Sequence, residues 1–166
     1  FFKGSVDDLR AARDASGLPV LRKDFVVDDY QLWEAKVMRA SAVLLIVRIL
    51  DRAQLRDYLA LAREELKLAA LVEVHTEKEL DAALDAKADL VGINNRDLDT
   101  FRTTLETTAR LRPLVPPGAV VVSESGIGSR EDLVLLRQMK VDAVLIGELL
   151  VKSADPEKKI RELRGV

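Results

Sequence analysis

Charged side chains that could perform acid–base chemistry lie at the ends of short apolar runs in the sequence. Lys23 belongs to the first of these runs, Glu73 to the third and Glu124 to the fifth. Two carboxylates and an ammonium in one pocket can serve as general base and general acid, because burial and mutual charge shift their pKa values toward neutrality. This combination suits carbon chemistry beside a carbonyl, although a ring of structural ion pairs across the end of a sheet is an alternative interpretation.

Residues after other runs could hold a negatively charged substrate. Arg96 can bind a carboxylate through its planar guanidinium, with the amide of Asn94 fixing the orientation. Gly126 and Gly147 follow the last two runs and leave room for a phosphate to approach backbone N–H groups. Phosphate sites recur at these two positions in (βα)8 barrels, but either glycine could also be a turn that needs a positive φ.

Metal binding and nucleophilic catalysis have weak support in this sequence. His75 is the only histidine and there is no cysteine, so we expect no metal site and favour a hydrogen-bonded or exposed structural role for His75. Ser123 and Ser125 have no neighbouring histidine to act as a base. A nucleophilic triad is therefore not expected.

The segments that must position these residues alternate between expected strands and expected helices. Short runs rich in Val, Ile and Leu are separated by charged segments whose apolar residues repeat at helical spacing, which is typical of an α/β protein built from parallel βα repeats. We expect six strands, each apolar on both faces, at residues 20–25, 42–47, 70–75, 90–94, 119–125 and 143–147. We expect helices at residues 5–15, 29–38, 52–66, 77–86, 104–111, 129–139 and 156–163. Ser5, Thr76 and Ser129 are the expected N-caps of three of them.

Four helix ends depart from the usual pattern of such repeats. Arg39, Lys67, Lys87 and Lys140 occupy junctions where a glycine in the left-handed conformation is typical. A non-glycine residue that takes a positive φ there costs about 1 kcal/mol. The helices must therefore end by another route or accept this cost, and the sequence gives no reason for the four cations.

Composition limits the broad class of protein. The chain has 166 residues, enough for one domain, and we expect a single domain at residues 1–166. The formal net charge of −2 lacks the basic excess of a nucleic-acid-binding protein. No apolar run approaches the ~18 residues that cross a membrane. Because cysteine is absent and no secretory signal is recognisable, we expect a cytoplasmic protein, and the missing initiator Met indicates a fragment.

Five motifs in order resemble the indole-3-glycerol phosphate synthase family. They are PVLRKDF (19–25), AVLLIV (42–47), LVEVH (71–75), GINNRDL (92–98) and VSESGI (122–127). The resemblance extends from the loop FFKGS (1–5) through essentially the whole chain. It implies that the six expected strands are the third to eighth of a (βα)8 barrel, so that the fold is an incomplete TIM barrel of about six βα units lacking the first two strands.

The resemblance also implies an activity. The family is a lyase of tryptophan biosynthesis that cyclises and decarboxylates 1-(2-carboxyphenylamino)-1-deoxyribulose 5-phosphate, a phosphorylated small molecule, to indole-3-glycerol phosphate without a cofactor. Lys23 matches the proposed general acid, Glu73 the proposed general base and Glu124 a second essential carboxylate. Which carboxylate is the base depends on the pKa values in the folded site.

The substrate-binding residues follow from the same motifs. Asn94, Arg96 and Ser125 match positions that orient the anthranilate part of the substrate. The phosphate site is matched by Gly126, Gly147 and Glu148. The family usually has a small residue, often Ser, where this chain has Leu149, and it has glycine at the four junctions that are cationic here.

An alternative interpretation is a catalytically inactive or strongly impaired folded fragment. The family's first strand supplies a lysine, a carboxylate and a phosphate-binding serine that have no counterpart here. Unpaired edge strands would favour a homo-oligomer, or would need a separate piece that carries the first two strands. An unrelated barrel enzyme acting on a phosphorylated sugar is a third, more distant interpretation.

Overall fold

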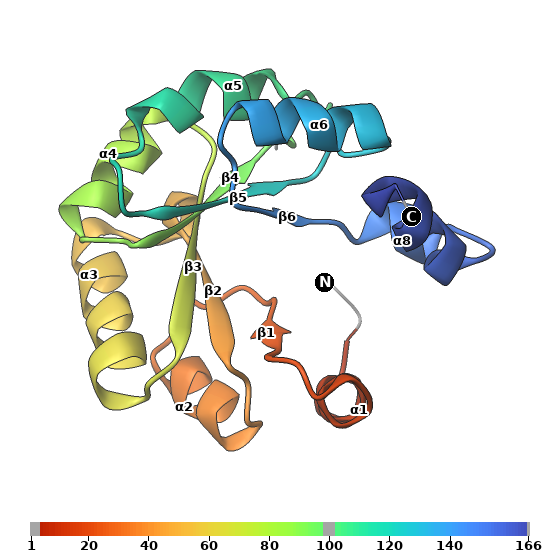
Figure 1. The fold of residues 1–166 in the computed structure, drawn as a ribbon. Helices are drawn as coiled ribbons and strands as arrows, with labels where there is room; N and C mark the ends of the chain where they lie inside the picture. The colour runs from red at the N-terminus through yellow and green to blue at the C-terminus, as the bar shows by residue number, and fades with distance from the viewer. Residues whose placement is uncertain (1–3, 98–101, 166) are drawn as a thin grey trace.

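The computed structural model describes residues 4–97 and 102–165. Its centre is a curved sheet of six parallel strands, with each strand paired to the next along the sequence (Figure 1). The strands are β1 (Leu21–Arg22), β2 (Ala42–Ile46), β3 (Ala69–Val74), β4 (Leu90–Asn94), β5 (Val120–Glu124) and β6 (Ala143–Leu145). Helices follow the strands and cover the outer face of the sheet, so the fold is an incomplete TIM barrel, as the resemblance implies.

The helices follow the expected order with small changes in length. They are α1 (Val6–Ser16), α2 (Tyr30–Val37), α3 (Arg52–Ala60), α4 (Glu77–Asp85), α5 (Glu106–Leu111), α6 (Arg130–Gln138), α7 (Glu148–Val151) and α8 (Pro156–Arg164). The short helix α7 was not expected. The helix expected at residues 52–66 is α3 followed by a π-helical turn, η2 (Leu61–Glu65), and two 3-10 turns, η1 (Val47–Ile49) and η3 (Arg112–Leu114), complete the set.

The expected N-caps are confirmed. The side chains of Ser5, Thr76 and Ser129 each accept a hydrogen bond from the backbone N–H three residues later. At Ser5 and Ser129 the third residue is an aspartate that accepts the cap's own N–H in return, which completes a capping box. These caps fix where α1, α4 and α6 begin and therefore where the loops before them end.

The two edge strands of the sheet are much shorter than expected, whereas β2 and β5 differ from the expected ranges by only one residue at an end. The strand expected at residues 20–25 has only Leu21–Arg22, because Asp24 Oδ1 accepts the N–H of Phe25 at 2.9 Å and the chain turns out of the sheet. The strand expected at residues 143–147 ends at Leu145, where the chain enters α7. β6 is apolar, as expected, but Ala143 and Val144 are exposed, so this edge strand is not buried on both faces.

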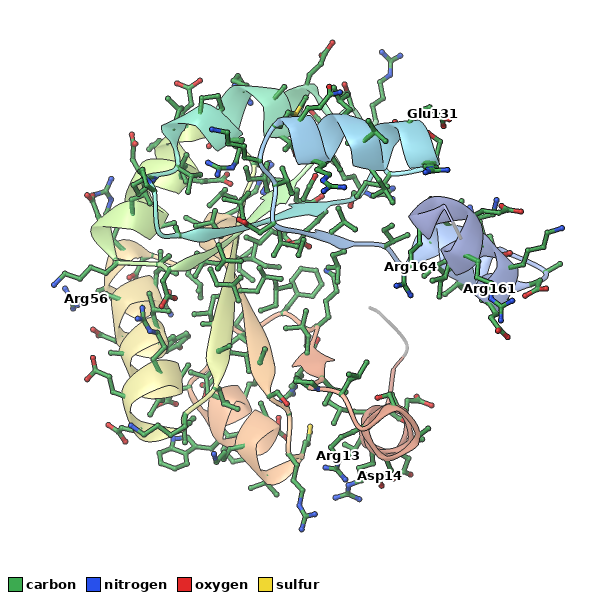
Figure 2. All side chains as sticks on the ribbon, in the orientation of Figure 1. Arg13, Asp14, Arg56, Glu131, Arg161 and Arg164 are labelled. Carbon is green, nitrogen blue, oxygen red and sulfur yellow. The ribbon has the colours of Figure 1, made fainter. Side chains whose placement is uncertain are left out.

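The core has two parts on the two faces of the sheet. The larger lies between the strands and the outer helices and includes Leu32, Val43, Val72 and Leu80, all essentially inaccessible to solvent. The smaller lies on the concave face and consists of Leu44, Ile46, Leu71 and Val122. Long charged side chains such as Arg56, Glu131 and Arg161 are exposed and point away from the sheet (Figure 2). Among the described helices, none combines the length and the apolar character needed to cross a membrane.

The four cationic junctions all adopt the left-handed conformation. The φ angles of Arg39, Lys67, Lys87 and Lys140 are 62°, 55°, 63° and 59°. The next residue in each case donates its N–H back into the helix, as in Ala88 N to Ala83 O at 3.0 Å. This is a Schellman closure, in which glycine is usual, so each cation adds about 1 kcal/mol of backbone strain.

Parts of the resemblance lie outside the described residues. These are residues 1–3 of the opening loop and Leu98 at the end of the GINNRDL motif.

Candidate active site

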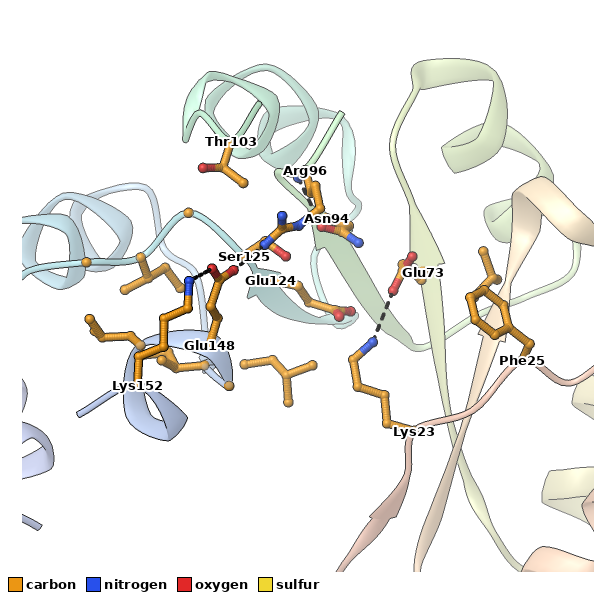
Figure 3. A pocket seen from close by; sticks show the side chains of 18 of the residues that line it. Lys23, Phe25, Glu73, Asn94, Arg96, Thr103, Glu124, Ser125, Glu148 and Lys152 are labelled. Atoms are coloured by element: carbon orange, nitrogen blue, oxygen red, sulfur yellow. Dashed lines mark hydrogen bonds and ion pairs between the residues drawn. The ribbon is translucent and has the colours of Figure 1, made fainter. Parts of the chain in front are cut away.

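A cavity of about 910 Å³ opens at the carboxyl ends of the strands. The side of a parallel sheet where strands end and helices begin is where barrel proteins gather functional groups. Every site residue expected from the sequence lines this cavity (Figure 3). They are Lys23, Glu73, Asn94, Arg96, Glu124, Ser125, Gly126, Gly147 and Glu148.

The three acid–base candidates converge on the floor of the cavity. Glu73 on β3 and Glu124 on β5 are 3% and 1% exposed. The Nζ of Lys23, just after β1, lies 4.0 Å from Glu73 Oε2. Burial is the main reason that the pKa of Glu124 rises to about 8, and the charge of Glu73 raises it further while Lys23 opposes the rise. Burial and the neighbouring carboxylate thus favour the neutral form of Glu124 over the charged one.

Gly92 makes the room for this arrangement. It lies on β4, between the strands that carry Glu73 and Glu124, and is paired in register with Glu73. A Cβ added at Gly92 would collide with Oε1 of Glu124 and would lie 3.2 Å from a methyl of Leu71. Only glycine at this position leaves the Glu124 carboxyl in its observed place.

A cluster of charges forms the opposite wall of the cavity. Glu148 on α7 accepts from Arg96 at 2.7 Å and from Lys152 at 2.6 Å (Figure 3). The hydrogen bond from Lys152, followed by that from Arg96, holds the pKa of Glu148 below its usual value. The Arg96 backbone N–H donates to Asn94 Oδ1 at 3.0 Å. The sequence analysis assigned Arg96 and Glu148 to separate parts of a substrate, whereas the structure brings them into direct contact.

The loop after β5 contains one of the two glycines that were expected to leave room for a phosphate or to form a turn with positive φ. Ser125 and Gly126 have φ angles of 65° and 74°, so Gly126 does occupy a turn that needs a positive φ. Gly147 differs, with a φ of −119° and open space where a Cβ would stand. The alternative reading of these glycines as positive-φ turns therefore applies to Gly126 and not to Gly147.

A buried polar network behind the cavity was missed by the sequence analysis. Asn95, 1% exposed, donates to Ser123 Oγ at 2.9 Å and to the carbonyl of Glu124 at 3.0 Å. Its Oδ1 accepts from the hydroxyl of Thr108 on α5 at 2.8 Å. This network holds the ends of β4 and β5 together beneath the site. The signal was the Asn94-Asn95 doublet at a strand end, because neighbours on a strand point to opposite faces.

His75 was also interpreted too generally. It is buried, and its ring lies between Glu73, two residues before it on β3, and Glu79, four residues after it on α4. The spacing E-x-H-x-x-x-E carries this signal, because a strand places residues i and i+2 on one face. Within residues 4–97 and 102–165, no three acidic or histidine side chains are grouped so that they could hold a metal ion.

The fold and the site together define a barrel-type α/β protein with a buried pair of carboxyls and a lysine at the carboxyl ends of its strands. Solved structures support the fold alone. The 3-hexulose-6-phosphate synthase from Salmonella typhimurium matches with a TM-score of 0.81 and 16% identity, over 96% of this chain and 78% of that chain. Thiamine phosphate pyrophosphorylase from Pyrococcus furiosus matches with a TM-score of 0.66 and 17% identity, over 99% and 89%.

Sequence comparison gives the family. The model of the indole-3-glycerol phosphate synthase family matches residues 1–163. The indole-3-glycerol phosphate synthase of Dehalococcoides mccartyi (strain ATCC BAA-2266 / KCTC 15142 / 195) is 50% identical over 165 residues, covering 98% of this chain and 63% of that protein. That of Bordetella pertussis is 53% identical over 163 residues, covering 98% and 62%. This chain belongs to the indole-3-glycerol phosphate synthase family, and it spans less than two thirds of the length of these relatives.

Proposed function

We propose that this chain carries the central acid–base site of an indole-3-glycerol phosphate synthase. The reaction is the cyclisation and decarboxylation of 1-(2-carboxyphenylamino)-1-deoxyribulose 5-phosphate, with loss of carbon dioxide and water and without a cofactor. The observation that carries the proposal is the convergence of Lys23, Glu73 and Glu124 in one cavity, where burial raises the pKa of Glu124.

The proposed roles follow the chemistry of these three groups. Loss of water needs an acid that protonates the departing oxygen and a base that accepts a proton from the substrate. Lys23 is the proposed general acid and Glu73 the proposed general base, and the Lys23 Nζ lies 4.0 Å from Glu73 Oε2. Glu124, neutral and buried beside them, can donate a hydrogen bond to a substrate oxygen or act as a second acid.

The opposite wall supports binding of a substrate that carries two anionic groups, a carboxylate and a phosphate. Arg96, Asn94 and Ser125 are proposed to orient the anthranilate carboxylate, and Gly126, Gly147 and Glu148 to surround the phosphate. Glu148 already satisfies Arg96 and Lys152, so a substrate anion must compete with its carboxylate for these two cations. A substrate that is both a carboxylate and a phosphate offers two replacements for that single carboxylate.

The partners and location of the chain belong to the proposal as well. We propose that the substrate is the only small-molecule partner and that neither nucleic acid nor membrane is bound, in a cytoplasmic setting. Self-association is proposed because, within the described residues, β1 and β6 each pair with a strand on one side only. Light scattering after size-exclusion chromatography tests it: a dimer or larger species supports self-association, and a monodisperse monomer overturns it.

The decisive experiment is a fluorescence assay for indole-3-glycerol phosphate formation by the purified chain. Glu73→Gln is the active-site variant, and Glu65→Gln, at an exposed carboxylate on the η2 turn, is the matched control. Turnover that is lost in Glu73→Gln and kept in Glu65→Gln supports the proposal. Absence of turnover in a sample with cooperative unfolding overturns it for this chain and favours the inactive-fragment alternative, including its need for a complementing piece.

A further inference from the structure

His75 lies directly behind Glu73 and contacts a second carboxylate. Its Nε2 is 3.4 Å from Glu73 Oε1, and its Nδ1 is 3.2 Å from Glu79 Oε2. The ring is 7% exposed, and the Glu73 side chain is 4% exposed. A histidine between two carboxylates in a buried site must have its protons distributed so that no two acceptors face each other.

The side of the ring that faces Glu79 can be assigned from the hydrogen bonds. The backbone N–H of His75 donates to Glu79 Oε2 at 2.7 Å, so this oxygen is an acceptor. Although burial works against a charged Glu79, hydrogen bonds from the side chain and backbone of His75 keep its pKa below the usual value. Glu79 is thus a carboxylate at neutral pH. Nδ1, facing the same oxygen, must carry a proton.

The other side of the ring then poses a problem. A neutral histidine with its proton on Nδ1 has a lone pair on Nε2. That lone pair would face Glu73 Oε1 in a site where Nε2 has no hydrogen-bond partner among the described residues. Two buried acceptors facing each other are unfavourable, whereas a proton between Nε2 and Glu73 satisfies both groups.

We propose that His75 is a positioning residue for the proposed base, with a proton on Nε2 directed toward Glu73 while Glu79 orients the ring through Nδ1. The inference rests on the proposed function in that it assumes that Glu73 accepts a proton from the substrate. Attraction between this N–H and the carboxylate keeps Oε1 of Glu73 on the side of the ring, 3.4 Å from Nε2, and Oε2 on the side of Lys23, 4.0 Å from its Nζ. The base is thereby held in one orientation.

Charged groups from each neighbouring element face this arrangement. Lys23 and Glu124 face Glu73 from the cavity side, and Arg48 of η1 acts on Glu79. Arg110 of α5 donates to the backbone carbonyl of His75 at 3.5 Å. His75 is the group that bridges the two carboxylates, so its proton responds to a change at either Glu73 or Glu79.

The chain offers a direct test, because His75 is the only histidine in the sequence. The ring nitrogens of 15N-labelled chain therefore give one unambiguous pair of NMR resonances. At pH 7 we expect both nitrogens to be protonated or to exchange with a proton, with Nδ1 protonated throughout. In Glu73→Gln the amide can donate to Nε2, so the Nε2 resonance should shift to the unprotonated position while Nδ1 stays protonated.

The control is Glu65→Gln, which removes an exposed carboxylate from the η2 turn and should leave both resonances unchanged. Three outcomes would overturn the proposal: an unprotonated Nδ1, an unprotonated Nε2 in the unaltered chain, or an Nε2 chemical shift that is unchanged in Glu73→Gln. None of these measurements requires turnover. The proposal on His75 can therefore fail or hold independently of the proposed function.

Two replacements of His75 separate positioning from a structural role. His75→Gln can present an amide N–H near the position of Nε2, whereas His75→Asn reaches only toward Nδ1. We expect kcat to fall about 10- to 100-fold in His75→Asn with KM changed less than about twofold, and to recover by about tenfold in His75→Gln. Equal losses in both variants, or a loss carried mainly by KM, would contradict the proposal.

Discussion

Replacement of Glu124 by glutamine should make the protein more stable at alkaline pH. The side chain is 1% exposed, and burial followed by the neighbouring charge of Glu73 raises its pKa from 4.5 to about 8. The folded state therefore binds a proton that the unfolded state releases above pH 4.5. With respect to this group, the free energy of unfolding is highest below pH 4.5 and falls as the pH rises toward about 8. Above about pH 8 it no longer changes.

The size of the effect follows from the displacement of the pKa. A change from 4.5 to about 8 corresponds to a loss of about 5 kcal/mol at ~1.36 kcal/mol per pKa unit. Glutamine has the shape of the protonated glutamate and does not ionise. We therefore expect Glu124→Gln and the unaltered chain to have similar free energies of unfolding at pH 4.5, and the variant to be up to about 5 kcal/mol more stable at pH 9.

Urea unfolding followed by circular dichroism between pH 4.5 and pH 9 measures this difference. Glu65→Gln, at an exposed carboxylate, is the matched control and should give parallel curves. Glu73→Gln removes the charge that raises the pKa of Glu124, so it should move the fall in stability to lower pH. The reasoning is refuted if the advantage of Glu124→Gln is the same at both ends of the pH range.

Three further outcomes follow from the geometry. Lys87→Gly should raise the free energy of unfolding by about 1 kcal/mol, because the φ angle of Lys87 is 63° and glycine adopts this conformation without strain. Lys78→Gly, within α4, is the control and should lower the free energy of unfolding by a similar amount in the same urea titration. Arg96→Lys should raise KM at least tenfold with a smaller change in kcat, since a point charge loses planar carboxylate recognition, and steady-state kinetics would contradict this if KM stayed constant. Gly92→Ala should reduce turnover at least tenfold by displacing the Glu124 carboxyl, while urea unfolding shows a loss below about 3 kcal/mol; unchanged turnover would disprove the steric argument.

Most of the fold could be predicted because the central strands obey a local rule. Residues 42–46 and 90–93 carry no polar side chain, and the structure places them in β2 and β4, where most of them are buried between the helices and the concave core. The ends of the sheet could not be read in this way. Whether residues 23–25 or 146–147 continue a strand depends on a neighbouring strand and on local turns such as that at Asp24, and an apolar run specifies neither.

The sequence could predict that the candidate residues share one cavity, but not the contacts among them. Parallel strands bring their carboxyl ends to one edge, so polar residues after several strands had to share a cavity. The ion pair between Arg96 and Glu148 joins residues 52 apart in sequence and depends on α7, which the pattern did not indicate. Side-chain pairing across such distances is decided by packing, which a single sequence does not encode locally.

The division of labour between the two buried carboxyls illustrates this limit. In the sequence, Glu73 and Glu124 look alike: each is a carboxylate near the carboxyl end of an expected apolar strand. In the structure, Glu73 has the Lys23 ammonium at 4.0 Å and the His75 ring at 3.4 Å, whereas Glu124 faces the carboxyl of Glu73 and space left by Gly92. Groups that can stabilise a negative charge contact the first, and a negative charge opposes ionisation of the second. The proposed roles of Glu73 as base and Glu124 as the protonated partner therefore depend in part on Lys23 and Gly92, which other segments of the chain contribute.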